Sequence, residues 1–168
     1  MSDRRRTYLN NLVENMTYLG RYSIDVSNDN NQYNDITINL AEDIPSQFHT
    51  IIIIGESDIS YSTSSSSYPI YESLAEVNNL GYTVLKNGSS YSRNYSVYSS
   101  ESTYRSHFPG VNLYIGLGYN QTYVSYNAGL YYNDGILQFK LNNVSDPNFN
   151  KMHLSKSTSI FDLIGINE

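Results

Sequence analysis

The stretch YVSYNAGLYYNDGILQFKL, residues 123–141, decides the fold that we expect for this chain. Its side chains alternate in character with a period of two, which is typical of a strand that buries one face. One face would carry Val124, Tyr126, Ala128 and Leu130, and the other Tyr123, Ser125, Asn127, Gly129 and Tyr131. Asn133-Asp134-Gly135 has the composition of a tight turn. The stretch therefore predicts an antiparallel hairpin in which one row of the first strand is core, while the other row is too polar for a core.

Alternation of the same kind extends to other parts of the chain. Residues 111–119 alternate and, with the hairpin, predict a three-stranded meander. Residues 22–26 and 36–40 predict two antiparallel strands that are joined by an Asn-rich loop. HTIIIIGE, residues 49–56, is an unbroken β-branched run, which predicts a central strand covered on both faces.

The pair Asn87-Gly88 is the best local turn signal in the sequence. It lies between the alternating runs YTVLK and SSYSRNYSVY. Asn-Gly is favoured where both central residues of a two-residue hairpin turn need a positive φ. We therefore predict a type I′ hairpin in which Lys86 pairs with Ser89 and Val84 faces Tyr91.

Helical spacing is found near the N-terminus. Asp3 can cap a helix there, and Gly20 can end it. Between them, apolar residues recur three and four positions apart, at Leu9, Leu12, Val13, Met16 and Leu19. Pro69 predicts the start of a second, short helix that ends near Gly81.

Three segments follow from these patterns: an N-terminal helical arm (residues 1–20), a β domain (21–155) and a C-terminal clip (156–168). The clip is predicted as a short helical turn with four apolar anchors, Ile160, Phe161, Leu163 and Ile164. Roughly seven or eight strands with short turns predict a mainly β fold. We expect an antiparallel β-sandwich or small barrel with an N-terminal helix and one short internal helix.

Composition excludes several classes of partner. A net charge of −6 with four lysines argues against nucleic acid, which needs a basic face. The absence of cysteine excludes disulfides and thiolate metal sites. The longest apolar run, IIIIG, is too short for a membrane span, and the N-terminus lacks the apolar stretch of a signal peptide. We expect a soluble protein without a membrane span.

No constellation typical of catalysis or metal binding is present in the sequence. His49, His107 and His153 are not at metal-ligand spacing, and there is no Gly-x-Ser-x-Gly motif. Residues 25–31 alternate like the start of a calcium loop but lack the glycine, and the glutamate further on, that such a loop requires. We therefore expect no cofactor, no metal and no enzymatic activity.

Tyrosine, serine and asparagine supply much of the polar surface, with 18 tyrosines and no tryptophan. This mixture is typical of protein-contact surfaces, although aromatic residues also favour strands for packing alone. The candidate contact residues are Arg4, Arg5, Arg6, Tyr114, Tyr123, Tyr131 and Phe161. A charge introduced at Tyr123 or Tyr131 is predicted to disrupt assembly more than folding.

The Ser-, Asn-, Tyr- and Ile-rich composition resembles that of small β-rich virion proteins of bacteriophages, such as tail-ring, tail-hub or capsid-decorating subunits. The resemblance implies a structural subunit of the virion that contacts other copies of itself and neighbouring virion proteins. The segment Arg4–Arg6 and the STSSSSYP loop, residues 62–69, are the contact segments that it suggests. The alternative is a β-sandwich module that binds carbohydrate or a host surface.

Overall fold

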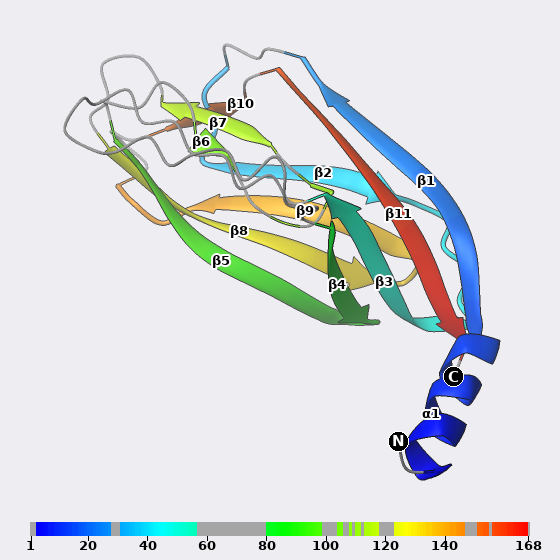
Figure 1. Cartoon of the computed structure of the whole chain (residues 1–168). Helices are drawn as coiled ribbons and strands as arrows, with labels where there is room; N and C mark the ends of the chain where they lie inside the picture. Colours follow the sequence, from blue (N-terminus) through cyan, green and yellow to red (C-terminus); the bar gives the residue numbers. More distant parts are fainter. Residues whose placement is uncertain are drawn as a thin grey trace.

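A computed structural model describes residues 3–27, 31–56, 80–98, 104–105, 108, 110–111, 113–117, 123–146, 151–154 and 156–167. In this part the chain is mainly β, with two antiparallel sheets of four strands each in a sandwich-like arrangement (Figure 1). The core lies between the inner faces of these two sheets.

The first sheet has the strand order β1-β11-β3-β4. Its strands are β1 (Met16–Val26), β11 (Ser157–Asn167), β3 (Phe48–Glu56) and β4 (Leu80–Lys86). The second sheet has the order β2-β9-β8-β5. Its strands are β2 (Asp35–Ala41), β9 (Ile136–Asn143), β8 (Tyr123–Asn133) and β5 (Ser89–Tyr98).

Two smaller features complete the described part of the chain. A three-stranded sheet has the order β10-β7-β6, with β10 (Met152–Leu154), β7 (Tyr114–Leu117) and β6 (Tyr104–Arg105). Helix α1 (Asp3–Glu14) precedes β1 and extends beyond the end of the first sheet (Figure 1).

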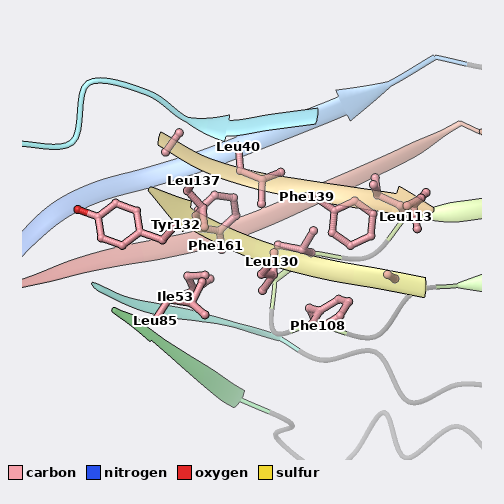
Figure 2. Packing of buried hydrophobic residues seen from close by; sticks show 14 of the residues in the cluster. Leu40, Ile53, Leu85, Phe108, Leu113, Leu130, Tyr132, Leu137, Phe139 and Phe161 are labelled. Carbon is pink, nitrogen blue, oxygen red and sulfur yellow. The ribbon is translucent and has the colours of Figure 1, made fainter. Parts of the chain in front are cut away.

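The alternation in β8 divides its side chains as the sequence predicts. Val124, Tyr126, Ala128 and Leu130 are fully buried, and Tyr132 is 2% exposed. Figure 2 shows that residues of both sheets meet in this core: Ile53, Leu85 and Phe161 from the first sheet, and Leu130, Leu137 and Phe139 from the second. Some of the tyrosines are therefore core residues.

The two sheets are linked by a buried hydrogen bond. The Tyr132 hydroxyl of β8 donates to the main-chain carbonyl of Phe48 in β3 at 2.6 Å. Burial raises the pKa of the Tyr132 hydroxyl, so the group stays protonated and remains a donor at neutral pH.

Several strands have partners other than those expected. β1 pairs with β11 and β2 pairs with β9, so the expected pairing of β1 with β2 is wrong. β7 pairs with β6 and β10, so the expected meander is reduced to the β8–β9 hairpin. Alternation shows that a segment is a strand, but the partner depends on burial of the whole core, which a local pattern does not contain.

The turn at Asn87-Gly88 is present, but it does not join paired strands. β4 pairs with β3 in the first sheet, and β5 pairs with β8 in the second. The Asn87 N–H donates to the His49 carbonyl at 2.7 Å, and the Gly88 N–H donates to the Tyr132 carbonyl at 2.8 Å. The pair is therefore the point at which the chain passes from one sheet to the other, and the predicted hairpin is wrong.

The type I′ conformation occurs at the other turn. At Asn87-Gly88 only the glycine has a positive φ, of 78°. Asp134 and Gly135, between β8 and β9, both have positive φ, of 47° and 80°, as a type I′ turn requires. The turn predicted at residues 133–135 is thus confirmed.

The two ends of the chain also differ from expectation. α1 ends at Glu14, and Met16 to Gly20, expected in the helix, lie in β1. The C-terminal clip is not a helical turn, because β11 is a strand between β1 and β3. Two of its inward-facing residues, Ser157 and Ser159, are small and polar. The sequence of this segment therefore lacks a clear alternation of apolar and polar residues. Most of the short helix expected from Pro69 to Gly81 falls on residues outside the described part. Its last two residues, Leu80 and Gly81, belong to β4.

Replacement of the Tyr132 hydroxyl tests the link between the sheets. We expect Tyr132→Phe to lower the free energy of unfolding by about 1–3 kcal/mol, because the buried Phe48 carbonyl loses its donor. The measurement is denaturant unfolding followed by circular dichroism. Tyr82→Phe is the matched control, since Tyr82 is 72% exposed and its change should stay within about 0.5 kcal/mol. Equal effects of the two substitutions would contradict the assignment.

Candidate functional site

The outer face of the first sheet carries a row of apolar side chains that crosses all four strands. The register aligns Tyr18 of β1 with Ile164 of β11, Ile164 with Ile52 of β3, and Ile52 with Val84 of β4. The alternate residues of β3 and β11, Ile53 and Leu163, are fully buried on the inner face. We call the four aligned outer residues the apolar row.

The side chains of the apolar row are open to solvent to different degrees. Tyr18 is 63% exposed and Val84 is 47% exposed, while Ile52 and Ile164 are half-buried. The next row of the same face adds the half-buried Ile54, paired with Tyr82, and the exposed Ile160 lies further along β11. The prediction that β3 is covered on both faces therefore holds for its inner face, while its outer face is covered only in part.

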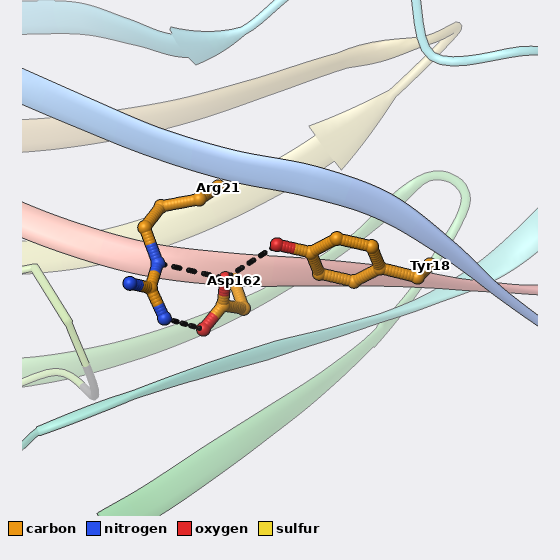
Figure 3. A network of polar contacts seen from close by, with 3 residues as sticks. All are labelled: Tyr18, Arg21 and Asp162. Carbon is orange, nitrogen blue, oxygen red and sulfur yellow. Dashed lines mark hydrogen bonds and ion pairs between the residues drawn. The ribbon is translucent and has the colours of Figure 1, made fainter.

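One charged network lies within this face. Asp162 of β11 is placed opposite Arg21 of β1 by the strand register. The Arg21 guanidinium donates from Nε to Asp162 Oδ1 at 3.1 Å and from Nη2 to Oδ2 at 2.9 Å. The Tyr18 hydroxyl donates to the same Oδ1 at 2.8 Å (Figure 3). Both carboxylate oxygens of Asp162 therefore have donors from β1.

The network shifts the pKa values of its members in the directions that these bonds require. The hydrogen bonds from Arg21 and then Tyr18 hold the pKa of the Asp162 carboxyl below its ordinary value. The hydrogen bond to Asp162 raises the pKa of Tyr18 and that of Arg21. The ionised carboxylate, the guanidinium and the neutral phenol are thus the favoured forms.

The outer face of the second sheet is polar instead. The Asn127 amide donates to Asn94 Oδ1 at 2.9 Å, and the Gln138 amide donates to Asn39 Oδ1 at 2.8 Å. These contacts join β8 to β5 and β9 to β2, so the amides bind one another across the strands.

The two tyrosines expected in protein contacts, Tyr123 and Tyr131, lie on this polar face and are half-buried. The Tyr123 hydroxyl lies 2.5 Å from Ser125 Oγ, and hydrogen bonds from serine lower the pKa of Tyr123. The Tyr131 ring covers Gly129, where a β-carbon would lie 2.7 Å from Tyr131 Cε2. The Lys140 ammonium lies 4.9 Å from the centre of the same ring. Both tyrosines therefore have partners within their own sheet.

The other predicted contact residues are not gathered at one place. Arg4 and Arg6 are exposed on α1, and the side chains of Arg5 and Tyr114 lie outside the described part. Phe161 is 1% exposed and stacks on Tyr22 with ring centres 5.5 Å apart. The expected contact role of Phe161 is therefore corrected: its side chain points into the core, because β11 is a strand of the sandwich.

The sequence contains a pattern that indicates the apolar row, although the row itself was not predicted from it. Ile52 and Ile54 belong to the HTIIIIGE run, in which inward and outward positions are equally apolar. Such a run indicates that something covers the second face of the strand. The run predicts cover on both faces of β3, whereas the outer face is partly open.

The part of the chain that the structure describes carries neither a metal-binding cluster nor a membrane-spanning helix. No group of three or more histidine or carboxylate side chains within this part could hold a metal ion. None of its helices is both long enough and apolar enough to cross a membrane.

Comparison with known proteins gives no match: the chain matches no protein-family model, no curated protein and no solved structure. The two outer sheet faces are therefore the features from which a function can be proposed.

The Asp162 network predicts a specific dependence of stability on pH. A carboxyl whose pKa is lowered by folding stabilises the fold above its ordinary pKa, and this contribution is lost as the pH falls through the lowered value. We expect Asp162→Asn to lower the melting temperature by a constant amount near neutral pH, and the difference to shrink below about pH 4. Thermal unfolding at a series of pH values measures it.

The matched control for this measurement is the same substitution in an Arg21→Gln background. Without the guanidinium, Asp162→Asn should have a smaller effect with a weaker pH dependence, because the main cause of the lowered pKa is gone. An unchanged difference in the two backgrounds would show that Arg21 does not stabilise the carboxylate.

Proposed function

We propose that the chain is a non-enzymatic structural subunit that assembles with other copies of itself, as a tail or capsid component of a phage virion would. The observation that carries the assembly role is the apolar row on the outer face of the first sheet. The virion assignment follows the compositional resemblance to small phage virion proteins.

Exposed apolar side chains that lie together favour a role in protein association. Single exposed apolar residues are common on protein surfaces, but contiguous patches are typical of contact sites. Here the register places Tyr18, Ile164, Ile52 and Val84 side by side, with Ile54 and Tyr82 in the adjacent row. Each such side chain contributes about 1.5–3 kcal/mol when it passes from full exposure to full burial. Covering this face would therefore drive association.

The charge pattern of the face is compatible with burial. A buried carboxylate without partners is strongly destabilising, because its lost hydration is not replaced. Asp162 already accepts hydrogen bonds from Arg21 and Tyr18 within its own sheet. A partner can therefore cover the face without supplying a cation.

The outer face of the second sheet gives weaker support for the alternative, a carbohydrate-binding module. A sugar site needs polar groups that are available to a ligand, next to an aromatic surface. The amides of Asn127 and Gln138 donate to neighbouring asparagines, and the Tyr131 ring faces Gly129 and Lys140. We therefore propose the first sheet, and not the tyrosine row of the second, as the main contact surface.

A charge placed in the apolar row tests the proposal. We expect Val84→Lys to raise the dissociation constant of self-association roughly tenfold or more, because the ammonium would be buried among apolar side chains. The measurement is the solution mass by light scattering over a concentration series.

Two variants are controls for this experiment. Val144→Lys places the same charge on a valine that is 61% exposed and lies after β9, and the mass should stay that of the native chain. Tyr131→Lys alters the other outer face and should also keep the native mass. If only Tyr131→Lys dissociated the oligomer, the contact would lie on the second sheet and not on the first. A native chain that stays monomeric at all concentrations would refute self-assembly.

A further inference from the structure

Helix α1 extends away from both sheets at the end where β1 begins and β11 ends (Figure 1). All of its side chains that the structure describes are exposed: Arg4, Arg6, Thr7, Asn10, Asn11, Val13 and Glu14. Val13, at 66%, is among the most exposed large apolar residues of the described part. It belongs to the apolar spacing of Leu9, Leu12 and Val13 in the sequence.

A helix of this length needs a tertiary contact. α1 has 12 residues, and isolated helices shorter than about 12–15 residues are marginal in water. The arginines in its first turn oppose the helix dipole and weaken it further. A contact that covered an apolar position such as Val13 would stabilise α1.

The junction with β1 prevents α1 from folding back over its own sheet. Only Asn15 separates the helix from the strand. The Asn15 N–H donates to the Asn11 carbonyl at 3.2 Å, which continues the helix, and the Asn15 carbonyl accepts from the Asn167 N–H at 3.0 Å. A reversal of direction needs a loop, and this junction has none.

The apolar row has the size that such a helix requires. Twelve residues of α-helix span about 18 Å, and a row across four neighbouring strands spans about 14 Å. Val13 of the helix and Tyr18 and Val84 of the row are exposed, while Ile52 and Ile164 between them are half-buried. Each copy thus carries the two surfaces that a helix-on-sheet contact needs, α1 and the apolar row.

From these observations we propose that α1 of one copy lies across the apolar row of a neighbouring copy. The inference deepens the proposed function and rests on it, since it requires self-assembly. A helix-on-sheet contact joins two different surfaces, so it can be exchanged within a two-fold pair or can continue from copy to copy around a ring.

Cross-linking between two single-cysteine variants tests the contact, because the native chain has no cysteine. Full-length Val13→Cys and Val84→Cys chains with different tags are co-expressed, and the assembly is treated with a short bis-maleimide. We expect several-fold more product that carries both tags than from the control pair Val13→Cys with Val144→Cys. Tyr82→Cys, in the adjacent row, replaces Val84→Cys if that variant folds poorly.

The outcomes separate this inference from the proposed function. Preferential cross-linking of Val13→Cys to Val84→Cys or Tyr82→Cys supports helix docking. Suppose that light scattering shows an oligomer while the yield of product with both tags stays at the level of the Val13→Cys and Val144→Cys pair. That result would refute the docking of α1 and leave self-assembly supported. Preferential cross-linking of Val84→Cys chains to each other would also refute it, because the sheets would then meet face to face. A monomer at every concentration would refute both proposals.

Discussion

The rest of the structure depends on the packing of the two inner sheet faces against each other. Because side chains alternate along a strand, burying one face fixes which residues form the other face. The buried hydrogen bond from Tyr132 to Phe48 links β8 to β3 across this core. Close backbone packing adds a second restriction, since a β-carbon on Gly55 would lie 2.4 Å from the Cα of Gly110. The two outer faces are therefore set by the same constraint that forms the core.

The two outer faces differ, and the difference has a chemical consequence. On the second sheet, amides and hydroxyls bind one another, as Asn127 does with Asn94 and Ser125 with Ser96. Such a face is stable in water, because its polar groups are solvated or paired. On the first sheet, Ile52 and Val84 gain nothing from water. A partner that covered the first face would gain the free energy of burying apolar area, whereas a partner on the second would gain less, because the polar groups there would lose hydration.

The sequence predicts local features well and the pairing of distant segments poorly. The buried row of β8 follows directly from its period of two, and the Asp134-Gly135 turn from its composition. Asn87-Gly88 is a turn as well, but its flanking strands enter different sheets, which depends on long-range burial. The apolar row was not predicted for a related reason: Ile52 is as apolar as a core residue, and only the arrangement of the sheets shows that it faces outward.

The Asp162 network determines how the outer face of the first sheet would respond to a partner that covered it. Arg21 is 68% exposed while it binds Asp162, so the pair keeps a hydrated charge on the surface of the free subunit. Because the carboxylate already has its donors, a covering partner would leave no unpaired charge, and the cost would be the lost hydration of the pair. Tyr18 adds to this, since its hydroxyl binds Asp162 while it takes part in the apolar row. The polar and apolar parts of the face are therefore joined through one residue, and association need not break the network.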